Sequence, residues 1–166
     1  ATPGGLMKFD PASFSYDYFN NDPFNPQTMS YNSVSSLCVD KTGILWIGTT
    51  GMGINYYDHK ATRFSTFITN KDATSRISGF SVRSIVEDDY GYVWVSSDVL
   101  FRWNRKTGEV KSFEKSSIEL NAFGNTGIWS MIKSTDGNIW AATSEGLYNF
   151  DPASDKYRQY KFNSKD

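Results

Sequence analysis

Three residues of contrasting chemistry occupy one position of a repeated segment. Ser35, Arg83 and Trp129 each follow an aliphatic residue and precede a serine. An arginine fork can hydrogen-bond a carboxylate or a sulfate, and an indole face can stack on a sugar. Because repetition does not explain the difference, these residues are the predicted ligand-binding site. In the alternative interpretation, Trp129 covers a gap in a central channel, and Arg83 is solvated or pairs with a nearby carboxylate.

Other groups that could do chemistry are few. His59 is the single histidine and Cys38 the single cysteine, so the chain cannot assemble a zinc cluster or a Cys–His dyad. Asp88 and Asp89 resemble a cation-binding pair but lack the alternating ligands of a calcium loop. No glycine-rich phosphate loop follows a strand and precedes a helix. We therefore predict no catalytic residues, no metal and no cofactor, and we do not expect this chain to be an enzyme.

Three tryptophans set the period of the repeat. Trp46, Trp94 and Trp140 lie 48 and 46 residues apart, and each stands three residues after a glycine. A second block of mostly aliphatic and aromatic residues follows each tryptophan, at 53–58, 99–104 and 146–151. The same block opens the chain at 5–10. Self-similarity at this period indicates tandem structural units.

Each unit contains four short runs rich in aliphatic and aromatic residues, separated by turn residues. In the segments 40–43, 88–91 and 134–137, an Asp or Ser is expected to bond nearby amides while a Gly supplies positive φ. No helical periodicity occurs. The predicted fold class is all-β, with β-propeller blades that are four-stranded antiparallel sheets.

The predicted domain is one partial propeller with three complete blades and a partial N-terminal blade. Its parts are the second half of a blade at 1–19, an inter-blade loop at 20–33, and blades at 34–67, 82–113 and 128–162. Aromatic residues that recur in each copy are expected to pack between blades. These are the three repeat tryptophans together with Phe9, Tyr57, Trp103 and Phe150.

Successive connections in an up-and-down sheet alternate between two faces. The first and third turns of each unit are stereotyped and share one face, whereas the loops of the other face differ between units. The second face is therefore the predicted binding surface. Its inter-blade loops run over 20–33, 68–81 and 114–127.

Charge and hydrophobicity exclude several partners. Lys and Arg number 17 against 18 Asp and Glu, so the net charge of −1 gives no reason to expect nucleic acid or an anionic membrane. The longest apolar runs are only a few residues, so no membrane span is predicted. The chain also opens without the apolar stretch of a signal peptide, which suggests a mature product or a piece of something larger.

The repeat resembles a known family. The run from Asp40 to Thr49, followed by 53–58, is similar to the two-component regulator propeller repeat, and the run from Asp136 to Asp151 matches almost as well. The second copy of the repeat, at 82–113, departs from this motif, because Val99 stands where the other copies have a glycine. The resemblance implies the periplasmic sensor region of a hybrid two-component histidine kinase of the Bacteroides type, with seven-bladed propellers that sense oligosaccharides. The resemblance does not identify any binding residues, because the residues of the repeat motif are those that pack the blades.

These observations favour a ligand-sensing propeller segment with a periplasmic location and an oligosaccharide ligand. A protein-interaction scaffold stays open as an alternative, and a propeller lyase or hydrolase is disfavoured by the single histidine. A partial ring leaves apolar blade faces open, so we also expect self-association, or contact with further blades of the parent chain, through the segments 1–19 and 128–162.

Overall fold

The computed structural model describes residues 2–61, 63–67, 81–97, 100–113 and 127–161. The chain divides into two compact units, Ala1–Val82 and Arg83–Asp166, called here the first and the second unit. Within the described ranges the chain has no helix with the length and apolarity of a membrane span. The predicted limit of the last blade at residue 162, and nearly all of the loops 68–81 and 114–127, lie outside the described residues.

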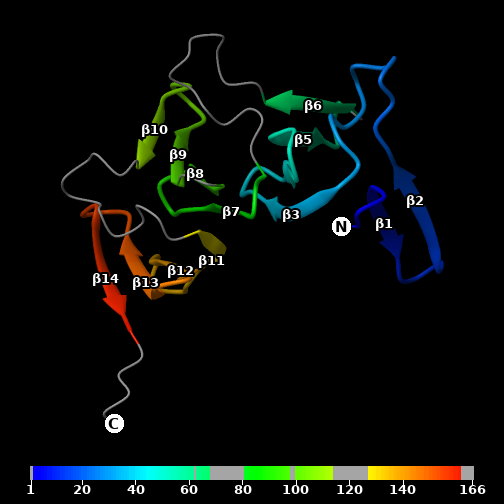
Figure 1. Ribbon diagram of the computed structural model, residues 1–166. Helices are drawn as coiled ribbons and strands as arrows, with labels where there is room; N and C mark the ends of the chain where they lie inside the picture. The colour runs from blue at the N-terminus through cyan, green and yellow to red at the C-terminus, as the bar shows by residue number, and fades with distance from the viewer. Residues whose placement is uncertain (1, 62, 68–80, 98–99, 114–126, 162–166) are drawn as a thin grey trace. The chain divides into compact units, whose positions relative to one another are not determined.

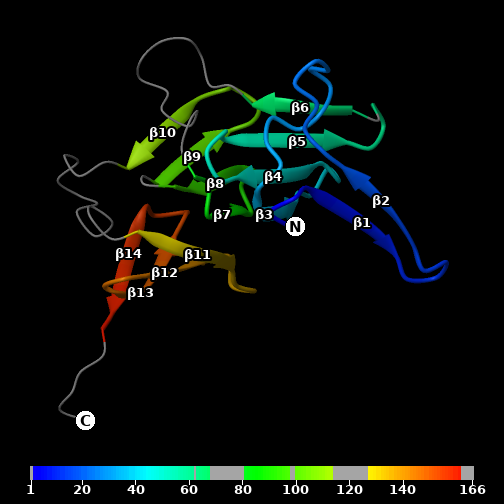
Figure 2. The same cartoon turned by 45° about the vertical axis from the view of Figure 1, so that its right-hand side comes forward.

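The first unit contains a two-stranded sheet and a four-stranded antiparallel sheet. The two-stranded sheet is formed by β1 (Leu6–Asp10) and β2 (Ser15–Phe19). The four-stranded sheet contains β3 (Val34–Val39), β4 (Leu45–Thr49), β5 (Ile54–Asp58) and β6 (Arg63–Phe67). These four strands pair in chain order, as Figure 2 shows, and β3, β5 and β6 of the same sheet are labelled in Figure 1.

The second unit contains two further four-stranded antiparallel sheets, each again in chain order. One contains β7 (Ser84–Glu87), β8 (Tyr92–Ser96), β9 (Leu100–Asn104) and β10 (Val110–Phe113). The other contains β11 (Ile128–Lys133), β12 (Ile139–Thr143), β13 (Gly146–Asp151) and β14 (Lys156–Tyr160). The prediction of an all-β fold built from up-and-down four-stranded blades is confirmed.

The first turn of two blades is organised by a buried aspartate. In both Asp40 and Asp88, Oδ1 accepts hydrogen bonds from the amides two and four residues further on, at 2.8–3.1 Å. A glycine with φ between 83° and 86° closes this turn in every complete blade, at Gly43, Gly91 and Gly137. The predicted roles of aspartate and glycine in these turns are confirmed.

The same aspartates also hold the repeat tryptophans. Trp46 Nε1 donates to Asp40 Oδ2 at 2.7 Å, and Trp94 Nε1 donates to Asp88 Oδ2 at 2.8 Å. The carboxylate thus ties the first turn to the second strand. In the third blade Ser134 stands at this position, and its hydroxyl donates to a carbonyl four residues on at 3.0 Å.

Asp88 and Asp89 do not act together. Both oxygens of Asp88 accept hydrogen bonds inside the blade, whereas Asp89 forms an ion pair with Lys133 Nζ at 2.5 Å. The resemblance of this pair to a cation site therefore does not extend to its geometry.

The Asp40 contacts predict a pH dependence. Burial alone would raise the pKa of Asp40, but hydrogen bonds from the Thr42 hydroxyl, the Trp46 indole and two backbone amides hold that pKa below its ordinary 3.8. A carboxyl with a lowered pKa stabilises the folded state fully above the unfolded pKa, and this contribution disappears as the pH falls through the folded value. We expect Asp40→Asn to lose about 2 kcal/mol near neutral pH and less in acid, measured by urea unfolding.

A graded variant controls this prediction. Thr42→Val removes one donor to Asp40 and should reduce the acid dependence of unfolding only in part. An Asp40→Asn variant whose free energy of unfolding falls as steeply in acid as that of the wild type would show that this carboxyl does not carry the dependence.

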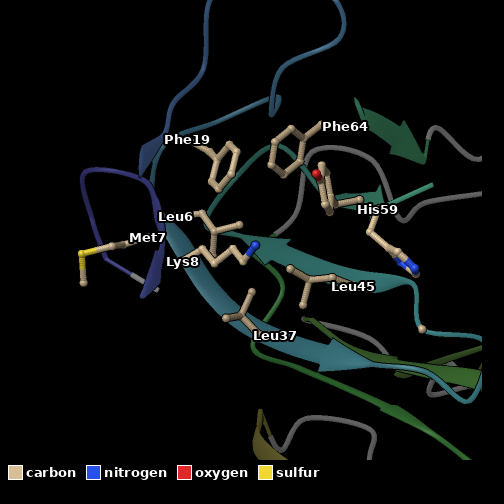
Figure 3. Close-up of a pocket in the computed structure, with 10 residues that line it drawn as sticks. Leu6, Met7, Lys8, Phe19, Leu37, Leu45, His59 and Phe64 are labelled. Atoms are coloured by element: carbon tan, nitrogen blue, oxygen red, sulfur yellow. The ribbon is translucent and has the colours of Figure 1, made fainter. Parts of the chain in front are cut away.

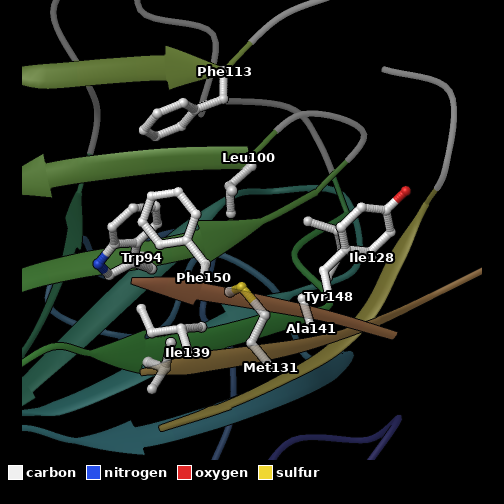
Figure 4. Packing of buried hydrophobic residues seen from close by; sticks show 10 residues of the cluster. Trp94, Leu100, Phe113, Ile128, Met131, Ile139, Ala141, Tyr148 and Phe150 are labelled. Atoms are coloured by element: carbon white, nitrogen blue, oxygen red, sulfur yellow. The ribbon is translucent and has the colours of Figure 1, made fainter. Parts of the chain in front are cut away.

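The core of the second unit lies between its two sheets. Trp94 is stacked on Phe113 of its own sheet, with ring centroids 5.5 Å apart, and meets Phe150 of the next sheet edge-on at 4.8 Å. Figure 4 shows these rings with Met131 and Ile139 beside them. The prediction that a repeat tryptophan packs between neighbouring blades is confirmed for Trp94.

A buried serine links the inner strands of these two sheets. Ser84 Oγ in β7 accepts a hydrogen bond from the Met131 amide in β11 at 3.0 Å. This bond adds a polar tie to the apolar contact between the blades.

The core of the first unit joins β1 and β2 to the four-stranded sheet. Its buried members are Leu6, Met29, Val34, Ile47 and Phe64. The loop over 20–33 is held against this sheet by the buried Asn55, whose side chain accepts from the Ser30 amide at 2.9 Å and donates to the Ser30 hydroxyl at 2.8 Å.

The expectation that Phe9 packs between blades is wrong for this structure. Phe9 is largely exposed and contacts Phe14 of its own hairpin, with ring centroids 6.2 Å apart. Side chains alternate between the faces of a strand, and Leu6, three positions before Phe9, faces the core. Phe9 therefore lies on the opposite face of β1, and in the described part of the chain it is left exposed.

Candidate functional site

A β-bulge presents Trp129 to solvent. The register between β11 and β12 shifts between Ile128 and Ser130, so that Trp129 stands outside the ladder. Its side chain is 62% exposed, which is high for an indole. A bulge re-aims one side chain without breaking the sheet, and such positions are common beside functional sites.

Arg83 lies beside this indole. Its guanidinium carbon is 5.4 Å from the centroid of the Trp129 ring, within the range of a cation–π contact. Arg83 Nη1 also donates to the carbonyl of Ser97 at 2.9 Å. A Cβ at Gly127 would lie 3.3 Å from Nη1, so the small residue there leaves room for the guanidinium.

Ser35 stands at the corresponding bulge of β3, where the register shifts between Val34 and Ser36. Its hydroxyl donates a hydrogen bond to the carbonyl of Val82 within the first unit. The structure therefore brings Arg83 and Trp129 together in the second unit, whereas Ser35 belongs to the first unit and bonds there. We call the two residues of the second unit the Arg83–Trp129 pair.

Two features of this pair were not foreseen from the sequence. The bulge and the Ser97 carbonyl both depend on how strands align, which residue types alone do not specify. The only sequence signal for the bulge is that the residue type changes at this one position among the three copies, while the residues on either side stay similar.

The other residues singled out in the sequence do not form a site. His59 is exposed in the turn between β5 and β6, as a solvated turn residue would be, and Cys38 carries a half-buried thiol. In the part of the chain that the structure describes, no three His, Cys, Asp or Glu side chains are grouped so as to hold a metal ion.

The geometry of the pair fixes the chemistry available to it. The guanidinium is permanently charged and only donates hydrogen bonds, and the indole offers an apolar face with a single N–H donor. Neither group can act as a general base or a nucleophile. The pair is suited to hold a ligand that combines a flat apolar face with oxygen acceptors.

Comparisons with known proteins agree with this architecture. Residues 28–51 match the family model described as the two component regulator propeller. The chain is 28% identical over 162 residues to histidine kinase P4 of Formosa agariphila, an alignment that covers 94% of this chain and 11% of the kinase.

Two solved structures share the fold. One is the extracellular domain assigned to a hybrid two-component system of B. thetaiotaomicron, with a TM-score of 0.78 and 22% identity over 98% of this chain and 22% of that one. Another is virginiamycin B lyase from Staphylococcus aureus, in a catalytically inactive form with quinupristin, with a TM-score of 0.66 and 12% identity over 98% of this chain and 50% of that one. These identities are low, so the likeness concerns the fold.

The matched segment spans the loop before β3, the strands β3 and β4 and the Asp40–Trp46 contact, which are the features that define a blade here. The repeat predicted from the motif is confirmed at residues 28–51, which match the two-component regulator propeller model and lie within a fold of propeller blades.

Proposed function

We propose that this chain is part of the extracytoplasmic, periplasmic sensor region of a two-component histidine kinase, and that it binds an oligosaccharide. The repeat family and the similarity to a histidine kinase support the signalling context. The likeness to an extracellular domain supports the location. The chain spans only 11% and 22% of the lengths of these two relatives, so the activity of the whole protein is itself part of the proposal.

The Arg83–Trp129 pair is the observation that supports an oligosaccharide as the ligand. An indole that is 62% exposed offers a flat apolar face, which sugars use for stacking through their C–H groups. The guanidinium beside it, held by the Ser97 carbonyl, supplies hydrogen-bond donors for the hydroxyl or carboxylate groups of the same sugar. A ligand with both features gains from both residues at once.

Catalysis is not part of the proposal. Arginine cannot accept a proton near neutral pH and indole has no basic nitrogen, so the pair lacks an acid–base group. The role that remains is binding, with the signal passed to a kinase domain elsewhere in the parent protein. A scaffold that binds protein is the competing function, and it would use the same exposed indole as a contact residue.

Isothermal titration calorimetry of the chain with neutral and acidic oligosaccharides tests the proposal. We expect Trp129→Ala to weaken the binding of an oligosaccharide roughly 5- to 30-fold, because stacking on an aromatic face contributes about 1–2 kcal/mol. The matched control is Phe24→Ala, which removes an almost fully exposed aromatic ring from the first unit and should leave the affinity unchanged.

The stability of the variants separates binding from folding. Because Trp129 is mostly exposed, Trp129→Ala should unfold within about 0.5 kcal/mol of the wild type. Absence of binding to every oligosaccharide would favour the scaffold function, and equal affinities of wild type and Trp129→Ala would remove the pair from the binding site.

A further inference from the structure

Ser96 carries a buried hydroxyl group that forms no hydrogen bond with the described residues. Its side chain is 0% exposed, and its Oγ is a buried polar atom without a partner among them. Such a group costs free energy, because it has lost its hydration and no protein atom replaces the water. Violations of this kind in natural proteins are expected at functional sites.

The position of Ser96 does not require a hydroxyl for packing. In the other two complete blades, the residue two positions after the repeat tryptophan is Gly48 or Ala142. A residue without a polar side chain therefore fits this place in a blade. The hydroxyl of Ser96 needs a reason other than the packing of the repeat.

The side chain of Ser96 faces the bulged strand β11. Ser96 pairs with Ser84 across the ladder, and side chains paired in this way lie on the same face of a sheet. Ser84 Oγ in turn accepts a hydrogen bond from the Met131 amide of β11 at 3.0 Å. Leu100, the partner of Ser96 on β9, belongs with Ile128 of β11 to one buried cluster. The Ser96 hydroxyl is therefore directed toward the strand that carries the bulge.

The backbone beside this hydroxyl holds Arg83. The Arg83 amide donates to the Ser96 carbonyl at 2.8 Å, and Arg83 Nη1 donates to the Ser97 carbonyl at 2.9 Å. The guanidinium lies over the Trp129 ring. A single short segment thus connects the buried hydroxyl to the Arg83–Trp129 pair.

An apolar groove of about 460 Å³ in the first unit offers another place for a ligand. Figure 3 shows its mainly apolar walls, which include Leu6, Phe19 and Phe64. Lys8 and His59, which also line it, are exposed side chains, and no residue of its walls has a buried polar atom without a partner. A sugar needs several fixed hydrogen-bond partners, so the surroundings of Ser96 suit it better than this groove does.

We propose that Ser96 is a third binding residue of the Arg83–Trp129 site, and that its hydroxyl bonds a hydroxyl group of the oligosaccharide. This inference rests on the function proposed above. A serine hydroxyl both donates and accepts hydrogen bonds, as a sugar hydroxyl does, so the two groups match. The ligand reaches Ser96 when the bulged segment 128–130 moves aside.

The bulge is the part of β11 that can uncover Ser96. Trp129 stands outside the ladder, so its displacement breaks no rung at this residue. In the covered state the Ser96 hydroxyl has no partner, whereas in the uncovered state it bonds water or ligand. The hydroxyl therefore favours opening. The Met131 amide reports the opening, because its bond to Ser84 protects it from exchange until β11 moves away.

Amide hydrogen exchange of the complete chain tests this movement without a ligand. Ser96→Ala removes the hydroxyl and introduces the residue that the third blade has at this position. We expect the Met131 amide to exchange about fivefold more slowly in Ser96→Ala, because a buried hydroxyl without a partner costs about 1 kcal/mol. Ser36→Ala is the matched control. It removes another buried hydroxyl without a described partner, in the first unit, and should leave this exchange unchanged.

Calorimetric titration tests the ligand role. With an oligosaccharide that binds the wild type, Ser96→Ala should bind about tenfold more weakly although it unfolds no more easily. A purely structural role would not lower affinity while stability is kept. Ser36→Ala should bind as the wild type does. Among analogues that each lack one hydroxyl, one should bind the wild type and Ser96→Ala equally well, and it identifies the hydroxyl that Ser96 holds.

Two results would each overturn this inference and leave the proposed function intact. One is equal affinity of the wild type and Ser96→Ala for an oligosaccharide whose binding Trp129→Ala weakens. The other is exchange of the Met131 amide that is no slower in Ser96→Ala. If the wild type binds no oligosaccharide, the proposed function fails and the ligand role of Ser96 fails with it, so the two failures are distinguishable.

Discussion

Trp94→Ala is expected to destabilise the second unit by about 5 kcal/mol. Removing a buried tryptophan leaves a cavity that costs about 3–5 kcal/mol. The substitution also removes the hydrogen bond that the Trp94 indole donates to the fully buried Asp88 at 2.8 Å, and the loss of this bond adds to the cost. This total is comparable with the whole stability of a small domain. Urea unfolding followed by circular dichroism measures it, and hydrogen exchange should place the loss in β7–β14.

The control is Trp129→Ala, which removes the same side chain from the same unit. Trp94 is 1% exposed and Trp129 is 62% exposed, so the two substitutions differ in burial and not in chemistry. We expect a difference of roughly 4 kcal/mol or more between them. Similar losses for the two variants would mean that Trp94 is not the anchor of the core between the blades.

Gly146→Ala is expected to cost about 3 kcal/mol in the same unit. Gly146 opens β13 with φ of 120°, a conformation that residues with a side chain avoid. A Cβ there would lie 2.4 Å from the carbonyl oxygen of Tyr160, which belongs to the backbone of the neighbouring strand β14 and cannot turn aside. The substitution should separate β13 from β14 at their ends, and thermal or urea unfolding measures the loss.

Gly108→Ala is the control that separates backbone strain from steric overlap with a neighbouring strand. Gly108 also has positive φ, 75°, but a Cβ there meets nothing within 4 Å. Its loss should be limited to the conformational penalty of about 1 kcal/mol. If Gly146→Ala is no worse than Gly108→Ala, the close approach of β14 does not constrain this glycine.

The blades were predictable because their signals are local and repeated. Four short apolar runs and a glycine at each first turn specify an antiparallel meander whatever surrounds it. A single short apolar run could be a strand or a helix, but three copies of the same pattern remove that ambiguity. The Asp40–Trp46 bond was not predicted, although both residues stand in the motif. The two residues lie six apart, and their side chains meet only because the hairpin folds back and brings a buried carboxylate oxygen within hydrogen-bond distance of the indole nitrogen.

The candidate site was predicted in part. The change from Ser35 to Arg83 to Trp129 at one position signalled that this position is free of the packing that fixes its neighbours. The structure supplies the physical reason at Ser35 and Trp129, which occupy bulges and leave the ladder. The approach of Arg83 to Trp129 depends on the packing of β7 against β11, which connects residues 46 positions apart and cannot be derived from either segment alone.

The exposure of Phe9 shows the limit of reasoning from repetition. An aromatic residue at this position is buried in blades that have a neighbour on that side, as with Phe150. The residue type therefore predicts whether its position is buried in a typical blade. Whether a given copy is buried depends on which surfaces surround it.

The most direct test of the proposed sensor function follows the indole N–H signals of the chain by NMR during titration with an oligosaccharide that binds. The chain has five tryptophans, and the signal of Trp129 is identified by its absence in Trp129→Ala. We predict that the Trp129 signal shifts while that of the buried Trp94 stays in place. A titration in which the Trp129 signal does not move, although the oligosaccharide binds, would contradict the assignment of the Arg83–Trp129 pair as the ligand site.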